Sequence, residues 1–206
     1  FSVDKIVLIE LIIELIIIHF IRFVYKIILL ANIYKYVYTL KVRLFKMAEN
    51  YRDTVAAIII NKDKKVLMCE HIWIDNAWQF PQGGVENGES EEDALKRELY
   101  EEIGTKKIKI VKKMPNQVVY KFPFYLKSKY QIDGQKQTYF LVYFYGDDSE
   151  IVFDKQDKPE FKEFEWVNLD EPPKKVIYFK KLAYLEALNF FKKDLECFDY
   201  KEHHNN

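Results

Sequence analysis

Three glutamates stand within five positions of the chain, and their spacing predicts a site for a divalent cation. Glu98, Glu101 and Glu102 belong to the stretch RELYEEIG, which Gly104 closes. On a helix, which advances by about 100° per residue, these side chains fall within roughly a quarter of a turn. Like charges at this spacing repel by a few tenths of a kcal/mol, and the dipole at a helix C-terminus disfavours anions. A bound cation would relieve both conflicts, and carboxylate oxygens suit Mg²⁺ or Mn²⁺.

A solvated acidic helix face is the plainer interpretation of such a charge run, and charge alone does not decide between the two. The preceding stretch WQFPQGGVENGES favours the cation site. It contains Pro81, Gly83, Gly84 and Gly88, and glycines let a backbone approach a ligand closely. Ser90 is then expected to cap a helix that Gly104 ends in the left-handed conformation. The sequence therefore predicts a flexible loop followed by an acidic helix.

Residues 83–105 carry a family resemblance. GGVENGESEEDALKRELYEEIGT resembles the Nudix box, G-x5-E-x7-R-E-U-x-E-E-x-G-U, in which U is aliphatic. One position departs from the pattern, since Thr105 stands where the family has an aliphatic residue. The resemblance implies a Nudix hydrolase, an α/β/α sandwich whose loop–helix–loop binds Mg²⁺ and cleaves a nucleoside diphosphate linked to another moiety. The matching positions are Gly83, Glu89, Arg97, Glu98, Leu99, Glu101, Glu102 and Gly104.

The same resemblance implies a role for each of these residues. Glu89, Arg97 and Gly104 would be structural, with the arginine and glutamate bracing the loop against the helix. A distal glutamate that completes the metal site in the family matches Glu160, in KPEF, and Glu98 and Glu160 are the candidates for the base that takes a proton from water. The implied metal ligands are Gly83, Glu98, Glu101, Glu102 and Glu160, and the four glutamates form the implied catalytic set.

Sequence outside the box narrows the resemblance. The stretches WQFPQGG, YKFP, GQKQTYFL, PEFKEFEWV and VIYFKK are similar, in order, to bacterial RNA 5′-pyrophosphohydrolases, a clade that includes dinucleoside polyphosphate hydrolases. The likeness extends from about Tyr51 to the closing helix. It implies removal of pyrophosphate from the 5′-triphosphate end of RNA, leaving a monophosphate, as a first step of mRNA decay. A dinucleoside polyphosphate hydrolase and a non-catalytic nucleotide-binding module remain the alternatives.

Five residues match substrate-binding positions of that clade. Basic side chains would hold phosphates, and Phe179 would stack on a base, a contact worth roughly 1–3 kcal/mol. Without the resemblance, each basic residue would be interpreted as a surface charge and Phe179 as core. One departure concerns the strand before WQFP, where the family often has arginines and this chain has Glu70 and His71. The implied substrate contacts are Arg52, Tyr120, Lys136, Phe179 and Lys180.

Residues 1–46 differ from the rest of the chain. They contain no Gly or Pro and are dominated by Ile, Leu, Tyr, Phe, Val and Lys. Charged residues such as Glu14 and Arg22 interrupt the apolar run, and each central charge costs roughly 2.5–3.5 kcal/mol in a spanning helix. We expect residues 1–46 to be translated upstream sequence, with the working protein starting at Met47. A membrane-lying amphipathic helix is the second interpretation, and a true membrane anchor is the third. The expected division is residues 1–46 and a hydrolase domain at 47–206.

Composition sets broad limits on the domain. The chain has zero formal net charge and 49% hydrophobic residues, which indicates a globular protein rather than a general DNA-binding one. Its two cysteines are too few for a disulfide framework and favour a cytoplasmic location. Strand-like stretches and helical stretches mix without strict alternation, which predicts an α+β fold with a mixed sheet between helices. Strands are expected near residues 54–61, 65–71, 106–114, 117–122, 137–146 and 161–169, and a closing helix near 176–195.

Overall fold

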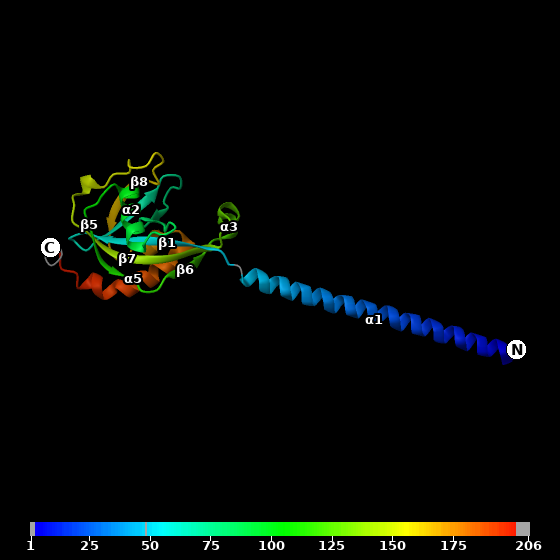
Figure 1. Cartoon of the computed structure of the whole chain (residues 1–206). Coiled ribbons are helices and arrows are strands. Elements are labelled where there is room, and N and C mark those ends of the chain that lie inside the picture. Colours follow the sequence, from blue (N-terminus) through cyan, green and yellow to red (C-terminus); the bar gives the residue numbers. More distant parts are fainter. Residues whose placement is uncertain (1–2, 48, 201–206) are drawn as a thin grey trace. The chain divides into compact units, whose positions relative to one another are not determined.

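The computed structural model describes residues 3–47 and 49–200 (Figure 1). These residues fall into two compact units, a single long helix and a globular unit that starts at Asn50. The long helix, α1 (Val3–Met47), has 45 residues. Side chains described along its length are exposed, among them Ile16, Phe20 and Leu30. Among the described residues, no helix combines the length and apolarity needed to cross a membrane.

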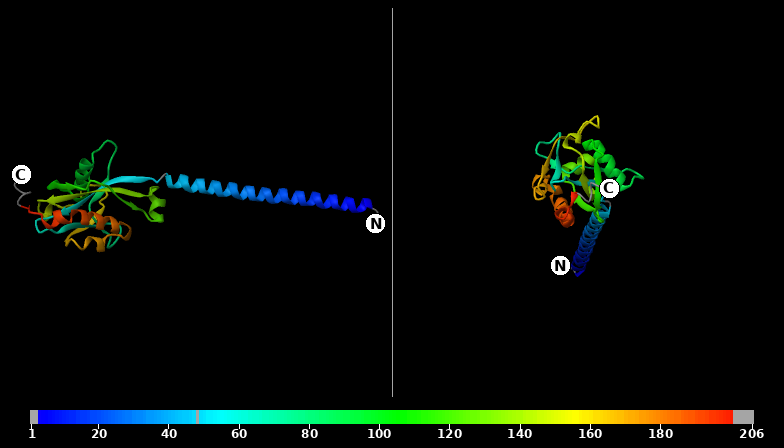
Figure 2. Two further views of the ribbon diagram at one scale, coloured as in Figure 1. Left: turned by 90° about the horizontal axis from the view of Figure 1, so that it is seen from below. Right: turned by 90° about the vertical axis from the view of Figure 1, so that its left-hand side faces the viewer.

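One mixed sheet forms the centre of the globular unit (Figure 2). Its main path has the order β3-β2-β1-β7-β5, with β4 paired to β1, β6 to β7 and β8 to β2. Strands β1 and β7 run parallel, and the other pairs are antiparallel. The strands are β1 (Tyr51–Ile60), β2 (Val66–His71), β3 (Trp78–Gln79), β4 (Gln82–Gly84), β5 (Ile108–Lys113), β6 (Val118–Lys121), β7 (Gly134–Phe144) and β8 (Phe161–Val167).

Alternate side chains of the central strands point into two separate cores, one on each face of the sheet. Ile58 of β1 and Tyr139 of β7 pack with Tyr184 of α5 (Lys181–Glu196). Ile59 packs with Leu99 of α2 (Glu91–Ile103) on the other face. Figure 1 shows α2 and α5 on opposite sides of the strands. The expected mixed sheet between helices is confirmed.

Helix α2 begins and ends where its sequence predicts. The Ser90 side chain accepts a hydrogen bond from the backbone N–H of Asp93 at 3.1 Å, which caps the first turn. Gly104 ends the helix with a φ of 72°, and its N–H donates to the carbonyl oxygen of Tyr100. A Cβ at this glycine would overlap the Val152 side chain. Both ends of the acidic helix are therefore fixed by local sequence.

The remaining elements are short. The stretch expected to be only a loop contains β3 and β4, which pair with β2 and β1. The closing helix starts at Lys181, five positions later than expected, after the 3-10 turn η2 (Tyr178–Lys180). Helix α3 (Phe124–Tyr130), α4 (Pro172–Lys175) and the 3-10 turn η1 (Asp148–Glu150) were not predicted.

Candidate active site

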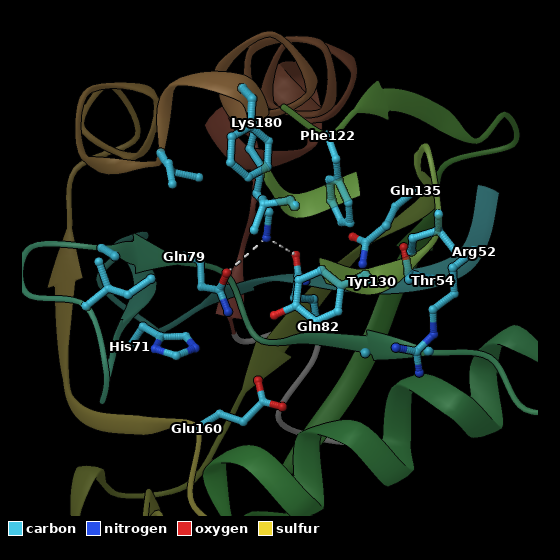
Figure 3. Close-up of a pocket in the computed structure, with 18 of the residues that line it drawn as sticks. Arg52, Thr54, His71, Gln79, Gln82, Phe122, Tyr130, Gln135, Glu160 and Lys180 are labelled. Carbon is cyan, nitrogen blue, oxygen red and sulfur yellow. Dashed lines mark hydrogen bonds between the residues drawn. The ribbon is translucent and has the colours of Figure 1, made fainter. Parts of the chain in front are cut away.

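A cavity of about 380 Å³ opens at one end of the sheet, on the face covered by α5 (Figure 3). Arg52 and Thr54 reach it from β1, and Gln135 reaches it from the neighbouring end of β7. The Arg52 guanidinium lies directly against the backbone of Gly84, where a Cβ would overlap it. Aromatic and aliphatic side chains form much of the remaining wall, including Trp78, Phe122, Tyr130, Ile177 and Phe179. One cavity thus combines a cation with apolar surface suited to a base.

Lys180 is the buried cation of the cavity. Its side chain comes from η2 and only 6% of the residue is exposed. The Nζ group donates to the Oε1 atoms of Gln79 and Gln82, both at 2.9 Å (Figure 3). Burial lowers the pKa of Lys180 to about 8, although Glu102 and Glu160 act in the opposite direction. The two amide oxygens therefore hold a lysine whose charge is lost at mildly alkaline pH.

An arginine fork joins the loop to α2. Arg97 donates from Nε to Glu89 Oε1 and from Nη2 to Glu89 Oε2, each at 2.8 Å. The same Nη2 donates to the carbonyl oxygen of Gly84 at 2.8 Å. Hydrogen bonds from Arg97 lower the pKa of Glu89 to about 2. A bidentate pair of this kind fixes orientation as well as distance, so the loop is held in one position above the helix.

Glu98 and Glu101 lie beside the same arginine. Arg97 Nη1 donates to Glu98 Oε1 at 2.8 Å and to Glu101 Oε2 at 3.3 Å. The Glu98 carboxyl group also lies against Gly83, where a Cβ would overlap its carboxyl carbon. Burial raises the pKa of Glu98, and the nearby charges of Glu101 and Glu160 act in the same direction. Glycine at position 83 thus makes room for a carboxylate that lines the cavity.

Glu102 is the most constrained of the three glutamates. It is 4% exposed, and its Oε2 accepts the backbone N–H of Gln82 at 2.7 Å. Its Oε1 is buried without a hydrogen-bond partner in the described structure. Burial raises the pKa of Glu102 well above its usual range, and the neighbouring charge of Glu160 adds to this. Glu160 itself lines the cavity (Figure 3).

These residues fit a divalent cation. A buried carboxylate oxygen without a partner and several mutually repelling carboxylates are relieved by a cation, and an all-oxygen set suits Mg²⁺ or Mn²⁺. Within residues 3–47 and 49–200, no group of three or more acidic, histidine or cysteine side chains is already gathered for a metal. Glu98 and Glu101 instead pair with Arg97, at 2.8 and 3.3 Å.

Six of the ten residues predicted to bind metal or substrate line the cavity, and four do not, namely Glu101, Glu102, Tyr120 and Lys136. Arg52, Gly83, Glu98, Glu160, Phe179 and Lys180 all line it. Lys136 follows Gln135 on β7 and points to the opposite face of the sheet, toward α2, because side chains alternate along a strand. Tyr120 lies behind the wall, 6% exposed, with its ring centroid 6.2 Å from that of Phe179.

Several cavity residues were missed by sequence reasoning. Gln79 and Gln82 stand on either side of Phe80 and Pro81 in WQFPQGG and accept hydrogen bonds from Lys180. A buried lysine requires hydrogen-bond acceptors, and this requirement was the signal that could have found them. His71, noted only as a departure from the family, lines the cavity, and its Nδ1 accepts the N–H of Trp73 at 3.1 Å. Tyr125 and Tyr130 come from α3, a helix that the sequence did not predict.

The chain is similar to known proteins over this globular unit. A family model described as NUDIX domain matches residues 50–187. The RNA pyrophosphohydrolases of Helicobacter pylori strain G27 and Sulfurovum sp. strain NBC37-1 are each 42% identical over 151 and 152 residues, which is 71% of this chain and 96% of theirs. Nudix hydrolase 26, chloroplastic, of Arabidopsis thaliana is 35% identical over 72% of both chains.

Solved structures agree on the fold. The dihydroneopterin triphosphate pyrophosphohydrolase of E. coli superposes with a TM-score of 0.57 at 20% identity, covering 69% of this chain and 97% of the other. An Ap4A hydrolase of C. elegans superposes with a TM-score of 0.52 at 18% identity, covering 69% and 98%. At this level of identity, such likeness concerns the fold alone. The match over residues 50–187, together with the relatives above 40% identity, shows that this chain is a member of the Nudix hydrolase family.

Proposed function

We propose that the protein removes pyrophosphate from the 5′-triphosphate end of RNA and leaves a 5′-monophosphate, as an initiating step of mRNA decay in the cytoplasm. The observation that carries the proposal is a cavity in which Arg52 and Lys180 lie close to Phe179 and to Glu98. The names of the bacterial relatives, which match over nearly their whole length, support the same substrate. Mg²⁺ is the proposed cofactor, with Mn²⁺ as an alternative.

Different residues of the cavity wall would bind the phosphates and the base of the substrate. Lys180 would donate from Nζ to phosphate oxygens, because an ammonium held between two amide oxygens has a third proton to give. Arg52, to the right of Lys180 in Figure 3, would hold a second phosphate with its planar fork. Phe179 would stack on the first base, with Tyr120 packed behind it to fix the ring.

The acidic residues would complete the site. Glu98, Glu101, Glu102, Glu160 and the carbonyl oxygen of Gly83 are the proposed ligands of the cation, which would neutralise phosphoryl oxygens and make water easier to deprotonate. Glu98 and Glu160 are the candidates for accepting the proton of the attacking water.

A direct comparison of two substrates tests the proposal. Equal amounts of triphosphorylated RNA and diadenosine tetraphosphate would be assayed side by side with Mg²⁺, and the RNA products separated. We expect faster turnover of the RNA, with monophosphorylated RNA and pyrophosphate as products. Much faster turnover of the dinucleotide would reject the RNA assignment.

Charge-removing variants separate an enzyme from a module that only binds nucleotides. Glu101→Gln and Glu102→Gln should each abolish turnover in Mg²⁺ and leave the fold intact. Glu92→Gln is the matched control, since Glu92 is an exposed glutamate in the first turn of the same helix. Unchanged rates in the first two variants would remove the catalytic assignment.

A further inference from the structure

Helix α3 (Phe124–Tyr130) exposes more aromatic surface than its packing explains. Phe124 is 84% exposed, Tyr125 is 57% exposed and Tyr130 is 52% exposed, and no residue of the helix is fully buried. Leu126 is its contact with the core on the α5 face. Large apolar side chains gathered in this way on a surface usually mark an interaction site.

The helix turns one face toward the cavity and the other away from it. Leu126 and Tyr130 are four positions apart, so they share a face, and both line the cavity. Phe124 precedes Leu126 by two positions, which places it about 200° around the helix. Tyr125 lies between these directions and lines the cavity as well. The ring of Phe124 therefore stands just outside the wall, with Tyr125 between it and the interior.

Positive charge accompanies these rings. The segment KFPFYLKSKY at residues 121–130 has three lysines and no acidic residue. Lys129 Nζ lies 5.1 Å from the ring centroid of Tyr130, and Lys127 pairs with Asp133 at 3.0 Å. Another exposed aromatic near the cavity, Trp73, stands two positions from Asp75, which pairs with Lys162 at 2.7 Å. A polyanion leaving the cavity would be attracted by the lysines of α3.

We propose that α3 binds the single-stranded RNA that follows the first nucleotide, with a base stacked on Phe124 and the backbone phosphates facing Lys129. Exposed aromatic rings beside lysines are the combination that binds single-stranded nucleic acid without sequence preference. The inference rests on the proposed function, because the strand reaches α3 only if its 5′ end occupies the cavity. In this proposal α3 contacts nucleotides that follow the 5′ end, and it takes no part in the hydrolysis at the 5′ end.

Two variants test the inference. Phe124→Ala and the double variant Phe124→Ala/Lys129→Ala remove residues that line neither core nor cavity, so both should fold, which a melting curve checks. Tyr145→Ala is the matched control, since Tyr145 is an exposed tyrosine (40%) whose ring has Lys107 Nζ at 6.0 Å, and it follows the opposite end of β7 from α3. Phe124→Trp keeps a ring for stacking and should retain wild-type behaviour.

The readout compares two substrate lengths. For a triphosphorylated RNA of about eight nucleotides, we expect KM to rise by roughly 5-fold or more in both variants, as the loss of one stacked base predicts. For a triphosphorylated dinucleotide, KM should be unchanged, and kcat should be unchanged for both lengths. A KM that rises equally for both lengths, or for neither, would overturn the inference.

Binding without hydrolysis separates this inference from the proposed function. Fluorescence anisotropy with a 5′-monophosphorylated RNA of about eight nucleotides reports affinity whether or not the protein hydrolyses triphosphate ends. Weaker binding by the Phe124 variants supports the role of α3 even if the wild type cleaves no RNA, a result that would reject the proposed function alone. Unchanged RNA affinity in these variants rejects the role of α3 in RNA binding.

Discussion

At the scale of a single residue, Glu102 links stability to activity. Its carboxyl group is buried, and one oxygen lacks a partner in the described structure. Glu102→Gln keeps an acceptor for the N–H of Gln82 and removes the charge. We expect a melting temperature without divalent ions that is equal to the wild type or about 2–4 °C higher, since each kcal/mol moves it by that much. Hydrolysis should fall by about 100-fold or more.

Melting temperatures measured with and without MgCl₂ test whether Glu102 binds the cation. A ligand that binds only the folded state raises its stability. The wild type should therefore gain more from Mg²⁺ than Glu102→Gln does. An equal gain in both proteins would place the cation away from this carboxylate.

Lys180 predicts a pH dependence of substrate binding. Because its pKa is lowered to about 8, the free enzyme loses this charge above that pH, and KM for triphosphorylated RNA should rise up to about tenfold between pH 7 and pH 9. Lys180→Arg stays charged and should lose this rise in KM. The same pH profile in both proteins would contradict the prediction.

The lowered pKa of Lys180 also decides how its contribution to folding stability changes with pH. Between pH of about 8 and the ordinary lysine pKa of 10.5, the unfolded chain binds a proton that the folded chain has released. The contribution of Lys180 to stability therefore increases with pH through this window and is lost as pH falls below about 8.

The contact of Arg97 with Glu89, which the family resemblance implied, is present in the structure, whereas its pairs with Glu98 and Glu101 were not predicted. Lys136 could not be placed in this way. A one-residue step along β7 decides which face of the sheet a side chain reaches, and the matching stretch does not reveal the register of the strand. The acceptors of Lys180 were also missed, because they come from positions about 100 residues earlier in the chain.

At the scale of an element, Gly83 on β4 links loop geometry to the acidic helix. A Cβ at this position overlaps the carboxyl group of Glu98. Gly83→Ala should displace that side chain and reduce kcat by about tenfold or more, since small misplacements at a reacting centre are costly. The melting temperature should change little, because the group displaced belongs to a flexible side chain.

The control for Gly83 is Gly88→Asn. Gly88 has a φ of 83° with no atom within 4 Å of an added Cβ, and asparagine tolerates positive φ. Activity close to the wild type is expected for this control. If Gly83→Ala were as active as Gly88→Asn, the assigned role of Gly83 would be wrong.

Long elements with clear patterns could be predicted from sequence, whereas short ones could not. The β-branched run of β1 and the capped helix α2 carry their own signals. Strands β3 and β4 have two and three residues and exist only through pairing with β2 and β1. Helix α3 has seven residues and no side-chain cap, so neither periodicity nor capping revealed it.

At the scale of the whole molecule, the described core residues all belong to the globular unit. Both clusters lie between residues 55 and 198. A chain that starts at residue 48 should therefore keep kcat/KM within about twofold and its melting temperature within about 2 °C of the full chain. Steady-state assays and melting curves of the two proteins check this. Loss of folding in the shorter chain would show that residues 1–47 are part of the domain.

We propose that acidic side chains of α2, with Glu160, hold a divalent cation beside the cavity. Crystals of the protein soaked in MnCl₂ test it most directly, because anomalous scattering locates manganese without ambiguity. We expect a peak in contact with carboxylates among Glu98, Glu101, Glu102 and Glu160. Fully ordered crystals with no peak there, and with Glu98 and Glu101 still paired to Arg97, would contradict it.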